Sequence, residues 1–339
     1  MSTNNVHLIP NSFIKWHLSA FTNPGDSEKL STILTHFNLS SEQLAHQGAI
    51  LTTAQYAQLL KLISTNFDDE SFSATEQGIR CGAFQLMTQS CITCSNLEKS
   101  IERMLSFYRV MSQELNWRMV KTTENIEIIF DLTNARKPST ACFSAFMMSI
   151  IWRWLSWMIA KPIFLDHVEF TIEQPSFSDE LVSVFNTEIT FDNNHNKLVF
   201  NRNYLTHRVK QTPQTLTTFL FNAPECLLSH YKSHLSISHQ VREYIETHQE
   251  IQKINLEQLA DSFCCSPQTL TRSLRRENTQ FKEIKEKVIK QRAINLLLKS
   301  ELTIEQIAFG LGFAEPSTFY RNFKKWTQLT PSQYRHIYP

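Results

Sequence analysis

The chain has 339 residues, 42% of them hydrophobic and 19% charged, and its formal net charge at pH 7 is +1. This length predicts two domains, or three small ones, each able to bury its own core. The seven cysteines are odd in number and lack a regular spacing, which argues against a disulfide-stapled secreted scaffold and indicates reduced thiols. The first residues lack the pattern of a signal peptide, so we expect a cytoplasmic protein.

Residues 1–110 are predicted to be mostly helical. Apolar residues recur at helical spacing over 30–37 and again over 56–63. Ser40 followed by Gln43 resembles a capping box at the start of a further helix.

From Trp117 onward the sequence pattern predicts strands that alternate with helices. Alternation of apolar and polar residues over 117–132 predicts a β-hairpin. An apolar helix from Pro138, a strand over 167–172 and a short helix over 179–185 follow. A second hairpin is predicted from 188–192 and 197–201, which flank an Asn-rich turn. This order predicts an α+β domain over residues 1–212.

The segment 143–160 resembles a membrane-spanning helix, because its 18 residues are mostly apolar and carry a single charge. Arg153 lies near its middle and its tryptophans cluster centrally, so we favour a buried helix over a membrane-anchored protein. The same helix supplies the effector-binding candidates, Trp152, Arg153 and Trp157, which either line a ligand pocket or simply fill the core.

A hinge is predicted over residues 213–237, where charge balance and pattern change. The remaining residues, 238–339, are predicted to be all helical. Ser266 is a plausible N-cap, with Pro267 at the first position of a helix in which Leu270 and Leu274 face inward. The outward residues are Gln268, Thr271, Arg272 and Arg275. Together with the preceding helix and the Cys264-Cys265 turn, this pattern is a helix-turn-helix.

A basic helix over 281–299 leads to a second helix-turn-helix. Thr303 is a suitable N-cap, Gly310 and Gly312 are expected to supply positive φ and close approach in the turn, and Pro316 starts the next helix. Phe319 and Phe323 face inward there. The outward residues are Pro316, Ser317, Tyr320, Arg321 and Lys324. At 1.5 Å per residue the basic helix spans about 28 Å, near the ~34 Å between successive major-groove faces.

The charges divide along the same boundary. From Leu235 to the end the chain has 15 Lys/Arg and 11 Asp/Glu, a net charge of +4, whereas residues 1–234 have 18 and 21, a net charge of −3. Positive charge therefore accompanies the two helix-turn-helix patterns, as contact with DNA phosphates requires. We expect double-stranded DNA to be a partner of the C-terminal part.

The second motif resembles a known family. The run Ile307-Ala308, Leu311-Gly312-Phe313, Ser317, Phe319, Arg321, Phe323-Lys324, Pro331 and Tyr334-Arg335 is similar to the signature of AraC/XylS-type transcription regulators. Gln328 departs from that signature, which has glycine there. The resemblance implies a regulator of transcription, an activator that contacts RNA polymerase, and base contacts from both outward helix faces.

The N-terminal part shows a second resemblance. Its order of elements, with the run NLEKSIERMLSFYRVMS, is similar over residues 20–225 to the effector domain of ornithine-utilisation-type AraC relatives, which is named after arabinose binding. This resemblance implies gating by a small-molecule effector. A ligand-independent or membrane-associated regulator with the same DNA-binding domain is the alternative, and a homodimer is left open because no heptad seam supports one.

Other chemistry has weaker support. Cys91 and Cys94 form a single CxxC, and His230 and His234 stand four residues apart, but neither pair completes a set of metal ligands. The sequence contains no glycine-rich phosphate loop, nucleophile elbow or HExxH motif. We therefore expect no enzymatic activity, no cofactor and no metal.

Overall fold

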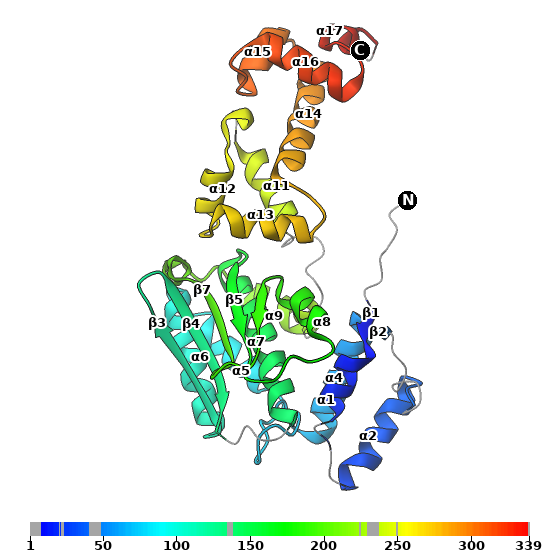
Figure 1. The fold of residues 1–339 in the computed structure, drawn as a ribbon, viewed down its shortest axis with the longest axis vertical. Helices are drawn as coiled ribbons and strands as arrows, with labels where there is room; N and C mark the ends of the chain where they lie inside the picture. Colours follow the sequence, from blue (N-terminus) through cyan, green and yellow to red (C-terminus); the bar gives the residue numbers. More distant parts are fainter. Residues whose placement is uncertain are drawn as a thin grey trace. The chain divides into compact units, whose positions relative to one another are not determined.

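The computed structural model describes residues 8–19, 21, 24–40, 49–133, 138–223, 225–228, 237–248 and 250–337. The chain forms two compact units, Met1–Tyr231 and Lys232–Pro339, here called unit 1 and unit 2 (Figure 1). Unit 1 combines helices with a sheet and unit 2 is helical, which confirms the predicted fold class. Two predicted features, the capping box that ends at Gln43 and the pair His230 and His234, lie outside the described residues.

Unit 1 begins with a small helical layer. Strands β1 (Leu8–Pro10) and β2 (Ala49–Thr52) pair antiparallel beside helices α1 (Asn11–Leu18), α2 (Pro24–His36) and α4 (Thr53–Phe67). Thr52 and Gln55 cap α4 reciprocally through side chain and backbone. His17 of α1 is buried, with its Nδ1 2.7 Å from the Tyr56 hydroxyl of α4, so a polar contact joins the two helices.

A five-stranded sheet forms the other part of unit 1. Its strands are β3 (Leu115–Lys121), β4 (Asn125–Leu132), β5 (Leu165–Glu169), β6 (Glu188–Thr190) and β7 (Lys197–Asn201), in the order β3-β4-β7-β5-β6. The helices are α5 (Ala83–Cys91), α6 (Leu97–Met111), α7 (Pro138–Ile159) and α8 (Ser178–Phe185). Strands β3 and β4 form the first predicted hairpin.

The prediction of a second hairpin is wrong. Strands β6 and β7 exist, but β7 pairs antiparallel with both β4 and β5, whereas β6 pairs parallel with β5. Three successive residues of β7, Leu198, Val199 and Phe200, are buried, so this strand needs neighbours on both sides. Strand β6 exposes Glu188 and Thr190, as suits an edge strand.

Helix α7 is the core helix of unit 1. Its segment Thr140–Ile159 is long and apolar enough to cross a membrane, yet 89% of an 18-residue apolar stretch within it is buried inside the structure. It packs on β4 and β7, and α6 covers β3 on the same side of the sheet, behind the strands in Figure 1. The membrane-like pattern therefore arises because all sides of this helix meet protein.

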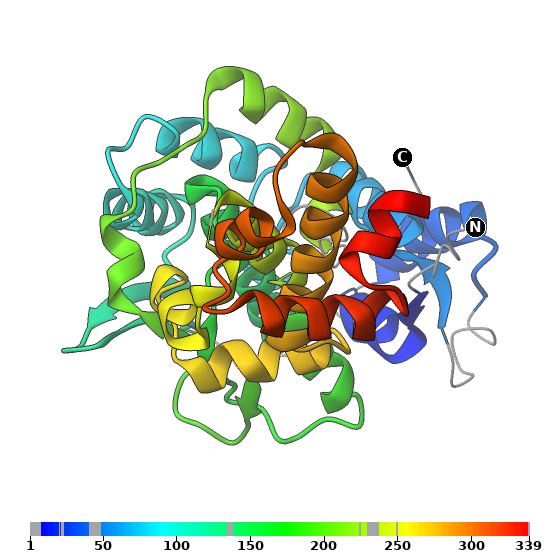
Figure 2. The ribbon, with the colours of Figure 1, turned by 90° about the horizontal axis from the view of Figure 1, so that it is seen from above.

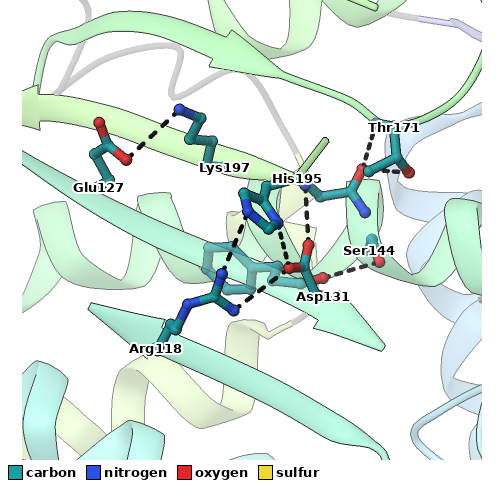
Figure 3. Close-up of polar contacts among 9 residues, drawn as sticks. Arg118, Glu127, Asp131, Ser144, Thr171, His195 and Lys197 are labelled. Carbon is teal, nitrogen blue, oxygen red and sulfur yellow. Dashed lines mark hydrogen bonds and ion pairs between the residues drawn. The ribbon is translucent and has the colours of Figure 1, made fainter. Parts of the chain in front are cut away.

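The opposite face of the sheet is polar (Figure 3). Asp131 of β4 lies 2.7 Å from His195 Nδ1 and 3.4 Å from the Arg118 guanidinium of β3. Lys197 lies 3.0 Å from Glu169 and 3.5 Å from Glu127. Charges of opposite sign thus alternate across neighbouring strands, which stabilises the sheet. Arg118 forms its ion pair within this network.

The predicted hinge begins too early. Residues Pro213–Asn222 form α9 and Glu225–Leu228 form α10, and both helices pack on unit 1. Leu216 and Phe219 are buried, and the Phe219 ring stacks on Trp157 of α7 at 4.0 Å between centroids. Because these apolar side chains pack against unit 1, α9 and α10 belong to it, and the division between the units falls at Tyr231 and Lys232.

Unit 2 contains two helix-turn-helix motifs. Helix α11 (Ile237–Thr247) and the 3-10 turn η2 (Ile251–Lys253) precede the first motif, α12 (Leu256–Ser262) and α13 (Pro267–Arg276). Helix α14 (Phe281–Lys299) leads to the second motif, α15 (Ile304–Gly310) and α16 (Pro316–Thr327), and α17 (Pro331–Ile337) follows. Asn255 and Thr303 start α12 and α15 with capping boxes.

Cationic side chains fasten both motifs to α14. Lys285 Nζ donates to the carbonyls of Gln252 and Ile254, 2.8 and 2.7 Å away, beside the first motif. Lys290 Nζ donates to Trp326 O of α16 at 2.9 Å. Two of the lysines that make this helix basic are therefore structural cross-links.

The two turns have matching backbones but different residues. Cys264 and Gly312 both have positive φ, at +52° and +89°. A Cβ on Gly312 would lie 3.2 Å from backbone atoms of Glu250, whereas a Cβ on Gly310, which is helical, would meet nothing within 4 Å. The prediction that both glycines are needed is thus corrected, because only Gly312 combines positive φ with close approach.

We expect Gly312→Ala to destabilise the protein by roughly 1–3 kcal/mol, since it adds left-handed strain to a backbone clash. Gly310→Ala is the matched control and is expected to be neutral or stabilising by up to about 1 kcal/mol, because alanine favours the helix. Denaturant unfolding of both variants checks this. Equal free energies of unfolding for the two would contradict the assignment.

Burial accounts for the CxxC pair. Cys91 and Cys94 are both buried, and burial raises the pKa of the Cys91 thiol to about 12. Cys91 Sγ lies 3.6 Å from the Ser100 carbonyl. Among the described residues no group of three His, Cys, Asp or Glu side chains is placed to hold a metal ion.

At pH 8 a thiol with this pKa is ionised in only about one molecule in 10,000. The thiolate fraction rises with pH, so we expect Cys91 to resist iodoacetamide at pH 8 in the native protein while exposed Cys81 reacts. Peptide mass spectrometry after timed labelling measures both sites. Alkylation of Cys91 at the rate of Cys81 without unfolding would show that the site is open.

Candidate DNA-recognition face and ligand cavity

Helix α13 presents the first candidate recognition face. The Ser266 hydroxyl accepts from Thr269 N–H and Pro267 occupies the first turn, as predicted. Leu270 and Leu274 are buried toward α11 and α12. The predicted outward residues Gln268 and Arg275 are exposed, while Thr271 and Arg272 are half-buried.

These four residues border one shallow depression on the surface of unit 2. Leu256 of α12, Pro267 and Arg276 complete its border. Arg276 was not predicted as a site residue, although its spacing of four from Arg272 places it on the same helical face. Three guanidinium groups, Arg272, Arg275 and Arg276, thus gather along α13, as a helix that approaches DNA requires.

Helix α16 presents the second face. Phe319 and Phe323 are fully buried, so the opposite side of the helix faces outward. Ser317, Arg321 and Lys324 are exposed there, and Pro316 and Tyr320 are half-buried. The helix ends at Gln328, which caps it with a φ of +64°. The residue that departs from the family signature therefore does adopt the left-handed conformation.

The two faces lie on one side of unit 2. Figures 1 and 2 together show α13 and α16 at opposite ends of α14 and on the same side of it, with their axes nearly parallel. The 19 residues of α14 span about 28 Å at 1.5 Å per residue. A direct hydrogen bond from Gln252 N–H to Leu311 O, 3.0 Å long, joins the two halves. Unit 2 is thus one compact unit with two outward helices.

Unit 1 contains a cavity of about 280 Å³, here called the unit 1 cavity. Its apolar wall includes Phe72, Phe84, Phe143, Phe146, Met147 and Ile150. Its polar residues include Lys61 and Ser64 of α4, Glu70, and Tyr108 of α6. Leu220 and Leu227, from α9 and α10, close another side. A concave, mostly apolar site with few polar groups is typical of small-molecule binding.

Two successive acids, Asp69 and Glu70, organise the loop beside this cavity. Asp69 accepts from the backbone N–H groups of Ser71, Ser73 and Ile79. Glu70 accepts from Gly82 and Phe84 N–H at 2.7 and 2.8 Å, at the start of α5. Burial raises the pKa of the Glu70 carboxyl, although these two hydrogen bonds oppose that change.

The predicted effector-binding residues lie elsewhere. Trp152 donates from Nε1 to Ile163 O at 2.7 Å, and Trp157 stacks on Phe219. Buried Arg153 donates to Leu227 O at 2.7 Å and to Val184 O at 3.0 Å. None of these three described residues borders the unit 1 cavity, because they point from other sides of α7. Glu70 and Tyr108, which border the cavity, were not predicted from the sequence, since no sequence motif distinguishes them.

Comparisons with known proteins agree with this architecture. Residues 29–209 match the family model for the arabinose-binding domain of AraC transcription regulators, and residues 259–337 match a helix-turn-helix domain. The chain is 22% identical over 259 residues to the ornithine utilization regulator of Pseudomonas aeruginosa, a match that covers 76% of each chain. It is 34% identical over 120 residues to the DNA-binding dual transcriptional regulator Rns of Escherichia coli, which covers 35% of this chain and 45% of Rns.

Among solved structures, the transcriptional regulator CdpR from Pseudomonas aeruginosa matches with a TM-score of 0.34 and 15% identity, over 93% of this chain and 99% of that one. The DNA-binding domain of AdpA, in complex with a target DNA, matches with a TM-score of 0.28 and 21% identity, over 30% of this chain and 93% of that one. The arabinose-binding model covers more than half of the chain. The chain therefore belongs to the AraC family of transcription regulators, with an N-terminal ligand-binding domain and a C-terminal helix-turn-helix domain.

Proposed function

We propose that this regulator reads two successive major-groove segments with α13 and α16, and that a small molecule bound in unit 1 controls this binding. The observation that carries the proposal is the placement of both outward helices on one side of α14. A spacing of about 28 Å is close to the roughly 34 Å repeat of the major groove. A rigid unit 2 therefore engages both segments without a change in its own shape.

The contacts divide into base reading and phosphate binding. We assign base contacts to Arg272 and Arg321, because a guanidinium can bond both acceptors of a guanine edge. Lys324 is assigned to phosphate, which a flexible ammonium binds without regard to sequence. The remaining members of the proposed interface are Gln268, Thr271, Arg275, Pro316, Ser317 and Tyr320.

Three further partners or properties belong to the same proposal. Activation requires contact with RNA polymerase, which follows from the family resemblance, and a homodimer through unit 1 is compatible with it. We place the protein in the cytoplasm, where its DNA and reduced cysteines belong. The relatives are transcription regulators, and we propose no catalytic role.

We expect Arg272→Ala and Arg321→Ala each to weaken binding to a selected operator by about 1–3 kcal/mol and to relax the preference at one base pair. Operators are selected from random duplex DNA with the wild-type full chain, and fluorescence anisotropy then measures affinity. Arg109→Ala, an exposed arginine of unit 1, is the control. Retention of wild-type affinity and base preference by both variants would refute the assignment.

For Lys324→Ala we expect a uniform loss of affinity across operator and random DNA. The slope of log K against log salt should become shallower by about 1, because one fewer counterion is released. A salt titration on both DNAs measures this slope. If the slope stays at the wild-type value, Lys324 does not contact phosphate.

A further inference from the structure

The unit 1 cavity has the size of a small ring compound. A cavity of ~150 Å³ lined by apolar side chains accommodates benzene, and the unit 1 cavity, at about 280 Å³, is nearly twice as large. It therefore holds one aromatic ring with a short substituent. A long chain or a sugar phosphate would need more space or more polar groups.

Aromatic side chains dominate the apolar wall. Phe72 and Phe146 meet edge to face, with 5.4 Å between centroids and an angle of 84° between ring planes. Phe84 and Phe143 extend the same wall. Rings arranged in this way offer both edges and faces to a further ring, which favours an aromatic ligand over an aliphatic one of equal volume.

A buried hydroxyl and a carboxylate supply the polar end. Tyr108 is only 1% exposed, and its hydroxyl makes no hydrogen bond to another described residue. Tyr108 borders the cavity, so a ligand that forms a hydrogen bond with this hydroxyl gains affinity. Glu70 borders the same cavity and keeps lone pairs beyond those used by Gly82 and Phe84.

The charge at the polar end of the cavity disfavours anionic ligands. Tyr108 and Glu70 border the same cavity, and the negative charge of Glu70 adds to burial in raising the pKa of Tyr108. Lys61 borders the cavity too, but its side chain is exposed. A ligand carboxylate beside Glu70 would be repelled, whereas a hydroxyl or ammonium can donate to it.

The last helices of unit 1 form part of the wall. Leu220 of α9 and Leu227 of α10 both border the cavity. Arg153 of α7 holds α10 by donating to Leu227 O. Residues 225–228 are the final described segment before unit 2. A ligand that touches Leu227 therefore acts on the segment that leads to the DNA-binding unit.

We propose that the unit 1 cavity binds a small aromatic alcohol or amine without a carboxylate, held by Tyr108 and Glu70, and that its occupancy acts on DNA binding through α10. This inference rests on the proposed function, which it deepens by naming the effector class. Coupling of this kind is reciprocal, so operator DNA changes the ligand affinity by the same factor as ligand changes the DNA affinity.

The experiment uses three probes of similar size, benzyl alcohol, benzylamine and benzoate, with the full chain. We expect the alcohol and the amine to bind with dissociation constants on the order of 1 mM or lower, and benzoate at least tenfold more weakly. Isothermal titration calorimetry measures binding. Bound probe should also slow alkylation of Cys81, which is exposed and borders the cavity.

Tyr108→Phe should weaken benzyl alcohol binding by about 2- to 12-fold, the effect of one hydrogen bond, while Tyr244→Phe in unit 2 should leave it unchanged. Met147→Trp should fill the cavity and abolish binding. If Met147→Trp does not fold, the comparison of Tyr108→Phe with Tyr244→Phe still tests the inference. Benzoate binding as tightly as the alcohol, no probe binding, or no effect of Tyr108→Phe would each overturn the inference.

Measurements of DNA binding distinguish a failure of this inference from a failure of the proposed function. The affinity for the selected operator is measured with and without saturating benzyl alcohol, and a change of at least threefold is expected. Intact operator binding without any response to the alcohol would overturn the proposed coupling and leave base reading by α13 and α16 standing. A response to benzoate alone would overturn the ligand class and support gating by another effector.

Discussion

The close approach of Gly312 to Glu250 is the constraint on which unit 2 depends. The turn of the second motif meets the segment before the first one with no room for a side chain, and the hydrogen bond from Gln252 to Leu311 lies beside that contact. Lys285 and Lys290 then fasten α14 to both motifs. The proposal that both outward helices meet one side of a duplex depends on these contacts, because they hold the two motifs in one arrangement.

The main feature of unit 1 is a partly open cavity beside its packed core. Helix α7 provides the apolar wall on one side, while the acids Asp69 and Glu70 hold the adjacent loop through backbone N–H groups. A loop ordered by carboxylates does not need to fill the space beside it with side chains. The cavity is thereby stabilised by hydrogen bonds around it, and Arg153 keeps α10 in place as its outer wall.

Much of the helical half could be predicted, because its signals are local. Caps such as Ser266 and Thr303, prolines at helix starts and the buried phenylalanines of α16 depend on neighbours within four residues. The pairing of β6 and β7 could not be predicted in this way, since partner choice depends on strands far apart in the chain. The structural roles of Lys285 and Lys290 could not be predicted for the same reason. A lysine that is exposed to solvent and a lysine that cross-links two segments look the same in the sequence.

By itself, the sequence determined the two helix-turn-helix motifs, their outward residues, the apolar helix and the alternation that marks the strands, because each follows from periodicity and capping along one segment. Only the tertiary structure decided that Gly312 and not Gly310 is constrained, that α9 and α10 belong to unit 1, and that Glu70 and Tyr108, and not Trp152, Arg153 and Trp157, border the cavity. Those facts depend on which surfaces meet across long separations, and side-chain burial and backbone contact of that kind leave no local pattern.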